Sequence, residues 1–172
     1  GKIRFSGPTN AVPFASGTVE YYGASQTVTA GNYYNLLFNG IGGVYTMSSD
    51  IDVANTLTVT NGAVTLQSVF NLTVGDAVTV VNPGTLTIEN SANLLQTTYT
   101  GPNTGNVIVK RNTTPVFELD VTFWSSPTTG TQTLGEFSPG TAWNRYLTYN
   151  SITDEYIIQD ATTAVFDKGI GY

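Results

Sequence analysis

Apolar residues recur in this chain at intervals that fit a stack of short strands. Between residues 28 and 94, one apolar pair follows another every six to eight residues. From Leu36 onward, every third pair lies 20 to 22 residues further on, as from Leu36 to Leu57 and from Leu57 to Val78. The first members of these pairs are Val28, Leu36, Val44, Ile51, Leu57, Val64, Leu72, Val78, Leu86 and Leu94. Three short strands per turn of about 21 residues is the pattern of a parallel β-helix.

Polar turn residues repeat with the same period. They form three series, which are Asn39, Asn61, Asn82 and Asn103, then Asp50, Asn71 and Asn93, and finally Asn55 and Asp76. Asn and Asp tolerate left-handed backbone and hydrogen-bond neighbouring groups, so stacked coils would align them into ladders. A meander of β-hairpins would not require turn residues to match at every third strand. The sequence therefore predicts an all-β fold built on a right-handed parallel β-helix.

The repeat does not cover the whole chain. We expect the solenoid to span residues 1–106, with strands near Ile3, Val12 and Val19 forming a less regular first coil. Residues 107–172 lack the period, and we expect them to form a β-rich cap with a hairpin near residues 146–158. This cap would cover the exposed strand edges at the end of the solenoid. The final residues GIGY resemble the start of a strand, which suggests a piece of a longer polypeptide.

Charged residues are few and unevenly placed. The 172 residues include 12 acidic and six basic side chains, and none of the basic ones lies between Arg4 and Lys110. Binding to nucleic acid or to an anionic membrane surface requires clustered Lys and Arg, so we expect neither partner. The absence of Cys and His excludes disulfides, thiolate nucleophiles and a Ser–His–Asp triad. No apolar run is long enough for a membrane-spanning helix, so we expect no membrane insertion.

The carboxylates offer few routes to catalysis. Glycoside hydrolysis needs two carboxyl groups about 5–9.5 Å apart. The period instead places Asp52 near Thr73 and Asp76 near Asn55. Asp50 and Asp52 form an Asp-x-Asp pair and are weak candidates for a Ca²⁺ site. We expect a chain that is not an enzyme and that has no cofactor.

Tyrosines and threonines leave two binding functions open. Outward tyrosines could contact glycans, although filling the core is the alternative role. The candidates for glycan contact are Tyr21, Tyr22, Tyr33 and Tyr34. Thr58 with Thr79, and Thr65 with Thr87, should stack outward at the repeat distance, and flat threonine arrays also occur in β-helical ice-binding proteins. The alternative is that Thr simply suits the surface of a strand.

Residues 17–40, GTVEYYGASQTVTAGNYYNLLFNG, carry the pattern G-T-V-E-Y…Q-T-V…G-x-Y-Y-N-L, and short coils such as L-T-V-T-N-G follow. This stretch resembles the repeat modules of large secreted surface proteins of Bacteroidetes, the Flavobacterium-like bacteria. Residues 123–158, FWSSPTTGTQTLGEFSPGTAWNRYLTYNSITDEYII, are similar to a module that often comes next. The resemblance implies export by the type IX secretion system, with its outer-membrane components as partners. It also implies release or display at the bacterial cell surface, and some such proteins are gliding adhesins. The C-terminal sorting domain of such proteins is not within this sequence.

These features together predict a structural, non-catalytic module of an adhesin-type protein outside the cell. Stacked coils would hold other parts of the parent protein away from the surface, with a stability close to a sum over neighbouring coils. The main alternative is a carbohydrate-binding or carbohydrate-active β-helix with surface glycans as partners. A further alternative is an ice-binding β-helix.

Overall fold

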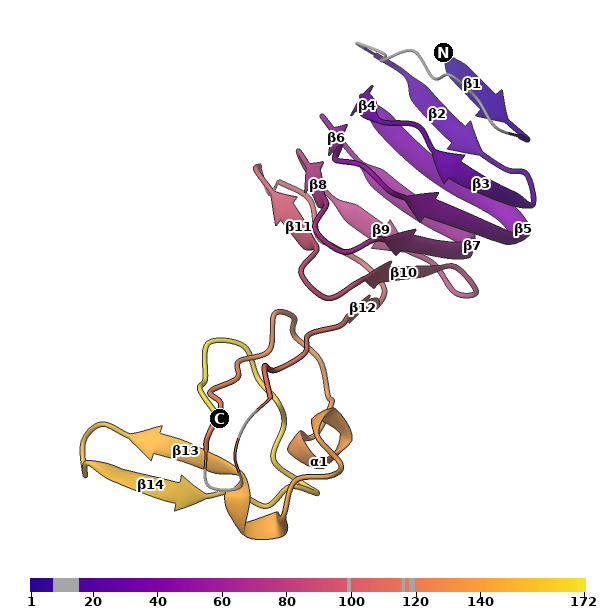
Figure 1. Cartoon of the computed structure of the whole chain (residues 1–172). Helices are drawn as coiled ribbons and strands as arrows, with labels where there is room; N and C mark the ends of the chain where they lie inside the picture. The colour runs from indigo at the N-terminus through magenta and orange to yellow at the C-terminus, as the bar shows by residue number, and fades with distance from the viewer. Residues whose placement is uncertain (8–15, 99, 116, 118–119) are drawn as a thin grey trace. The chain divides into compact units, whose positions relative to one another are not determined.

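A computed structural model of the protein describes residues 1–7, 16–98, 100–115, 117 and 120–172. Within these residues the regular secondary structure is almost entirely β-strand, with one short α-helix and one 3₁₀ turn (Figure 1). The described residues separate into two compact units, Gly1–Asn112 and Thr113–Tyr172. We call them the solenoid and the C-terminal unit. The strand expected near Val12 lies outside the described residues.

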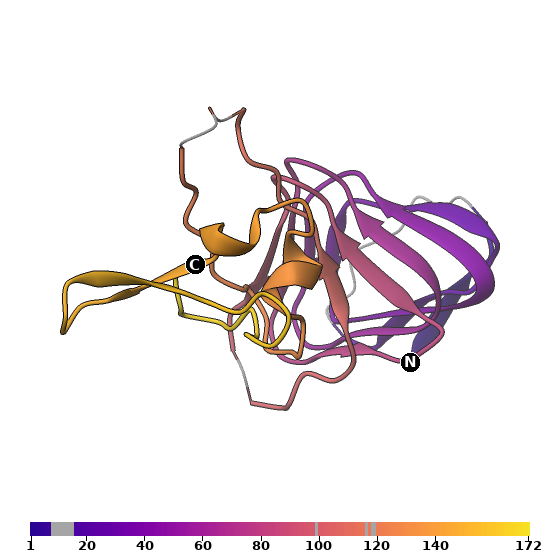
Figure 2. The same ribbon diagram turned by 90° about the horizontal axis from the view of Figure 1, so that it is seen from below.

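The solenoid consists of two parallel sheets. The large sheet contains β1 (Lys2–Phe5), β2 (Thr18–Tyr21), β3 (Ser25–Val28), β5 (Asn35–Met47), β7 (Leu57–Leu66), β9 (Val78–Val80), β10 (Thr85–Ile88) and β12 (Val107–Val109). The four-stranded sheet contains β4 (Gly31–Tyr33), β6 (Ile51–Val53), β8 (Asn71–Val74) and β11 (Asn93–Gln96). The strands of successive coils pair in parallel, which makes the unit a β-solenoid, as predicted. Seen from below in Figure 2, its chain winds repeatedly around the same interior.

The strand register follows the predicted period, because Leu57 pairs with Leu36 on one side and with Val78 on the other. Each regular coil has three sides, but β5 and β7 each cover two of them without a break. The sequence predicted turns at Asn39-Gly40 and Asn61-Gly62, and both lie inside these strands. Gly62 has a φ of +85°, which lets the chain bend while pairing with the adjacent coils continues.

The register differs from the prediction by one residue in the second half of β5. The sequence placed Val44 on the inward series with Val64, but Tyr45 pairs with Val64 and is buried. Val44 is 48% exposed. The cause is a difference in length at the corner, because residues 39–43 of β5 lie opposite the shorter segment 60–62 of β7. The pairing after this corner is therefore shifted. A one-residue slip exchanges the inward and outward faces of a strand.

Side chains from all three sides meet in one continuous core. Aromatic rings fill its first coils, where Tyr21 stacks on Phe38 with ring centroids 5.6 Å apart. Leucines and valines occupy the equivalent positions in later coils, such as Val59, which pairs with Phe38. The Tyr21 and Tyr33 hydroxyl groups hydrogen-bond at 3.1 Å inside this core. Burial, together with this hydrogen bond, raises the pKa of Tyr33 well above its ordinary value.

The solenoid continues past the predicted boundary. Strand β12 pairs in parallel with β10, and the compact unit ends at Asn112 rather than at residue 106. The sequence period is interrupted here, because residues 97–98 and 100–106 lie outside the strands. The N–H of Thr104 then donates to the carbonyl of Val78 at 3.1 Å, which returns the chain to the stack.

The C-terminal unit has a small core of its own. Its elements are α1 (Leu134–Phe137), the 3₁₀ turn η1 (Trp143–Arg145), β13 (Leu147–Asn150) and β14 (Glu155–Ile158). Strands β13 and β14 form the antiparallel hairpin that the sequence predicted. Leu134, Tyr146 and Phe166 are buried, and Phe137 stacks on Phe166 with ring centroids 4.0 Å apart. Thr133 caps α1 through a capping box with Glu136.

Candidate functional site

Asp50, Asn71 and Asn93 form a column of hydrogen bonds across three coils. The backbone N–H of Asn71 donates to Asp50 Oδ1 at 2.8 Å, and Asn93 Nδ2 donates to Asn71 Oδ1 at 3.0 Å. The structure therefore brings this predicted series together as a ladder. Its polar groups are used to join one coil to the next.

Only half of the longest predicted series meets in this way. Asn61 Nδ2 donates to Asn39 Oδ1 at 2.8 Å, and Asn39 Nδ2 donates to Glu20 at 3.0 Å. Asn82 is exposed and, among the described residues, has no bond to this column. Residues 81–84 occupy the corner that residues 60–62 occupy one coil earlier, and the extra residue displaces Asn82. Asn103 bonds Gln96 instead, and its Oδ1 accepts from the Val78 N–H.

Asn55 and Asp76 are neighbours through their backbones, but their side chains point to different partners. Asn55 Nδ2 donates to Asn35 Oδ1 at 2.8 Å. Asn35 lies 20 residues before Asn55, so the period could have identified it. The Asp76 carboxylate accepts from the N–H and hydroxyl of Thr100, both at 2.9 Å, and from the Gly101 N–H at 3.0 Å. These bonds hold the pKa of Asp76 below its ordinary value of 3.8.

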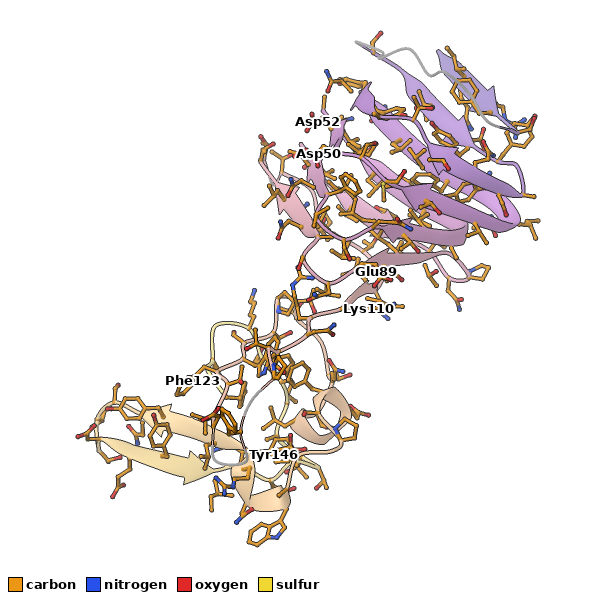
Figure 3. The ribbon with its side chains drawn as sticks, in the orientation of Figure 1. Asp50, Asp52, Glu89, Lys110, Phe123 and Tyr146 are labelled. Atoms are coloured by element: carbon orange, nitrogen blue, oxygen red, sulfur yellow. The ribbon has the colours of Figure 1, made fainter. Side chains whose placement is uncertain are left out.

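The two weak metal candidates have different surroundings, although both lie close to the start of β6 (Figure 3). Asp50 is part of the ladder with Asn71. Asp52 points outward from β6 and faces Asn32 and Thr73 on the neighbouring strands. The described residues contain no group of three or more acidic, His or Cys side chains that could hold a metal ion. The structure thus does not bring Asp50 and Asp52 into a set of Ca²⁺ ligands.

The four tyrosines proposed for glycan contact separate into two pairs. Tyr21 and Tyr33 occupy inward positions and are 0% and 2% exposed, so their rings are not available to stack on a glycan. Tyr22 and Tyr34 are 39% and 38% exposed. The Arg4 guanidinium lies over the Tyr22 ring, 4.3 Å from its centroid. Tyr34 lies on the outer face of the four-stranded sheet.

A groove with a volume of about 390 Å³ follows this outer face, and we call it the sheet groove. Its lining residues are Asn32, Tyr33, Tyr34, Asp52, Val53, Ala54, Thr73, Gly75 and Thr97. Backbone hydrogen bonds place Tyr34, Ala54, Gly75 and Thr97 at equivalent positions of successive coils. The small residues Ala54 and Gly75 therefore form a low floor between Tyr34 and Thr97. A Cβ at Gly75 would lie 1.9 Å from the Ala54 carbonyl oxygen, so this floor depends on glycine.

Threonines form a longer outward column than the sequence indicated. Thr65 pairs with Thr46 on one side and with Thr87 on the other, and Thr46 in turn pairs with Thr27. Thr58 pairs with Thr79 on a different side of the solenoid, as the period predicted. Thr27 and Thr46 were missed because the first coils are shorter than 21 residues.

The basic residues of the solenoid are engaged in ion pairs or hydrogen bonds. Lys2 and Arg4 contact the buried carboxylate of Glu20 at 2.9 and 2.6 Å. Burial raises the pKa of Glu20, but the bonds from Lys2, Asn39 and Arg4 outweigh it and leave the pKa below its ordinary value of 4.5. In the last coils, Lys110 pairs with Glu89 at 2.8 Å (Figure 3). Sequence reasoning missed Glu20 because an isolated Glu in a strand gives no signal of burial.

The C-terminal unit contains a larger cavity of about 620 Å³. Aromatic side chains make up much of its lining, including Trp124, Phe123 and Tyr146. Phe123 and Tyr146 are labelled in Figure 3. Arg145 also lines it, as does Asp120, whose carboxylate accepts from the Phe117 N–H at 2.9 Å. The sequence did not indicate this cavity, because residues 107–172 lack the repeat that aligned residues in the solenoid.

The fold defines the chain as a β-solenoid protein with a small, separate β-unit, and comparison with known proteins adds a family. Residues 43–172 match the model of the family described as Domain of unknown function (DUF8693). The match covers most of the chain, so the chain belongs to this family. It includes residues of both units. Neither the curated proteins nor the solved structures contain a match to this chain. Among the described residues, no helix has the length and apolar character needed to cross a membrane.

Proposed function

We propose that the chain is a structural, non-catalytic module of a secreted, adhesin-type protein at the bacterial cell surface. The observation that carries this proposal is the use of polar turn residues as coil-to-coil ladders. Asp50, Asn55, Asn61 and Asn71 all hydrogen-bond a neighbouring coil. Groups committed to stacking are suited to holding a rigid spacer together rather than to proton transfer or nucleophilic attack.

The proposed route out of the cell is the type IX secretion system. The support is the resemblance of residues 17–40 and 123–158 to modules of Bacteroidetes surface proteins. The outer-membrane components of that system would be the partners during export. In a gliding bacterium, the parent protein would act as an adhesin, and the solenoid would separate its adhesive parts from the cell.

Protease treatment of intact cells tests this location. An epitope-tagged parent protein in its own bacterium should be cleaved from the outside by added protease. In a strain that lacks the type IX translocon, the protein should be protected and should accumulate inside the cell envelope. Protection in both strains, or export without the translocon, would contradict the proposal.

Incubation with polysaccharides tests the non-catalytic part of the proposal. The purified chain should release no oligosaccharides from plant or algal polysaccharides above a heat-denatured control. Release at an ordinary enzymatic rate would show that the chain is a carbohydrate-active enzyme.

The threonine column favours ice binding as a second candidate function. Thr27, Thr46, Thr65 and Thr87 place hydroxyl and methyl groups at a regular spacing of about 4.8 Å along one side. Measurable thermal hysteresis that Thr65→Lys abolishes and Thr58→Lys preserves would support this function. The absence of hysteresis in the unaltered chain would exclude it.

A further inference from the structure

Polar side chains in the sheet groove differ from those of the ladders, because they have no partner among the protein groups that the structure describes. Asn32, Asp52 and Thr73 face one another across β4, β6 and β8. In the part of the chain that the structure describes, none of their side chains hydrogen-bonds another protein group. The hydroxyl groups of Tyr34 and Thr97 are equally free there. The nearby Asp50 and Asp76 carboxylates, by contrast, are both occupied by bonds to the next coil.

The groove also has a defined shape. Tyr34 stands at one end of a floor made by Ala54 and Gly75, and its ring is partly exposed. The outward row of Asn32, Asp52 and Thr73 flanks this floor, one residue per coil, at a spacing of about 4.8 Å. The volume of about 390 Å³ lies within the range of ligand sites, about 300–1,000 Å³.

These groups match the chemistry of a sugar. An amide, a carboxylate and a hydroxyl in a row can donate to and accept from the hydroxyl groups of consecutive positions on a glycan. The exposed Tyr34 ring offers a flat apolar surface to the C–H face of a pyranose. Uncharged hydroxyl groups are suitable donors to Asp52, whose two oxygens have no competing donor among the described protein residues.

Charge restricts the class of glycan. No basic residue lies between Arg4 and Lys110, and every groove residue falls in that interval. A uronate or a sulfated sugar would therefore meet the Asp52 carboxylate with no cation in the groove to offset the repulsion. A neutral glycan avoids this cost.

We propose that the sheet groove binds a neutral glycan, with Tyr34 as the stacking platform and Asp52 as the central hydrogen-bond acceptor. This role goes beyond that of a scaffold, and neither function requires the other. A glycan-binding solenoid would give the module its own contact with a surface.

Calorimetric titration of the full chain with defined oligosaccharides tests the proposal. The neutral probes are hexaoses of glucose, xylose and mannose, and the acidic probes are oligogalacturonate and oligoguluronate. At least one neutral hexaose should bind, and the acidic probes should bind at least tenfold more weakly. Failure of all neutral hexaoses, or a preference for the uronates, would overturn the proposal but would leave the scaffold function untouched.

Matched variants place the binding in the groove. Tyr34→Ala should weaken binding at least tenfold, whereas Tyr22→Ala, at almost the same exposure in another part of the solenoid, should not change it. Asp52→Asn should weaken binding severalfold, whereas the exposed Glu155→Gln in the C-terminal unit should have no effect. Circular dichroism melting of each variant checks the fold. Equal affinity of Tyr34→Ala and Tyr22→Ala would show that the glycan binds elsewhere and would overturn this assignment.

Discussion

The two units of the chain differ in how far apart in sequence their side-chain partners lie. In the solenoid the bonds span one coil, as between Asn61 and Asn39, 22 residues apart, and between Asn71 and Asp50, 21 apart. In the C-terminal unit several bonds are local, such as the capping bonds between Thr133 and Glu136, three residues apart. A repeated spacing can be recognised in the sequence and predicts how coils stack. An isolated local motif predicts only the turn in which it lies.

The cores differ in the same way. The solenoid has one continuous core to which the regular coils contribute equivalent positions. Among the described residues of the C-terminal unit, three are buried, with aromatic rings packed around them. Stability in the solenoid should therefore be shared among coils, while the C-terminal unit should depend on a few contacts.

The largest expected effect is the loss of a core leucine in each unit. Leu57→Ala should lower the free energy of unfolding of the solenoid by about 2–5 kcal/mol, because its neighbours only partly fill the cavity. Leu134→Ala should destabilise the C-terminal unit and leave the solenoid transition unchanged. Far-UV circular dichroism mainly follows the strands of the solenoid, and tryptophan fluorescence follows the C-terminal unit, which contains Trp124 and Trp143. Equal shifts of both signals in both variants would show a single cooperative unit.

A smaller effect is expected from breaking one ladder. Asn61→Ala removes the bond to Asn39 and should lower the free energy of unfolding by about 0.5–1.5 kcal/mol. The control is Asn32→Ala, an exposed asparagine of the solenoid without a protein partner among the described residues, which should change stability by less than about 0.5 kcal/mol. Urea denaturation of both variants measures the difference. Equal losses would mean that the ladders do not stabilise the stack.

The smallest effect concerns pH. Since the pKa of Asp76 is below 3.8 in the folded chain, its contribution to stability is present above that pH and is lost as the pH falls through the folded pKa. Asp76→Asn should therefore be less stable than the unaltered chain at neutral pH, and the difference should shrink below about pH 4. Urea denaturation across this range measures it. A difference that stays constant with pH would contradict the assigned bonds to Thr100 and Gly101.

The same test sharpens the comparison between the units. The pKa of Asp160 is also lowered, by hydrogen bonds from Thr162, only two residues further on. Asp160→Asn should therefore lower the stability of the C-terminal unit, measured as an unfolding transition followed by tryptophan fluorescence. The unfolding transition of the solenoid, followed by circular dichroism, should not change. A change in both would mean that this local turn supports the whole chain.

The period predicted the solenoid because equivalent positions of successive coils carry similar residues at a nearly constant spacing. Leu36, Leu57 and Val78 align as expected, because the corners of each coil, although individually unequal, add up to the same 21-residue spacing. Where corners differ, the prediction fails, as at Val44 and Asn82. Corner length depends on backbone bends and bulges, which carry no periodic signal. The end of the solenoid at Asn112 was hidden by the interruption of the sequence period in residues 97–106 for the same reason.

The candidate site was only partly predictable. Tyr34 and Asp52 were both identified from the sequence, but for separate reasons and with different ligands. Nothing in the sequence distinguished the outward Tyr34 from the inward Tyr33, because a one-residue change in register exchanges them. The groove itself depends on Ala54 and Gly75, whose small size has meaning only once their position beside Tyr34 is known.

Engineered disulfides test the central claim, that successive coils are stacked in register, because the chain has no cysteine of its own. Thr58 pairs with Thr79 in the next coil, at a strand spacing of about 4.8 Å that suits a disulfide. In a hairpin turning at Asn61-Gly62, Thr58 would instead lie opposite Thr65. After air oxidation, intact mass analysis should find a disulfide in Thr58→Cys/Thr79→Cys and free thiols in Thr58→Cys/Thr65→Cys. The reverse result would contradict the stacked solenoid.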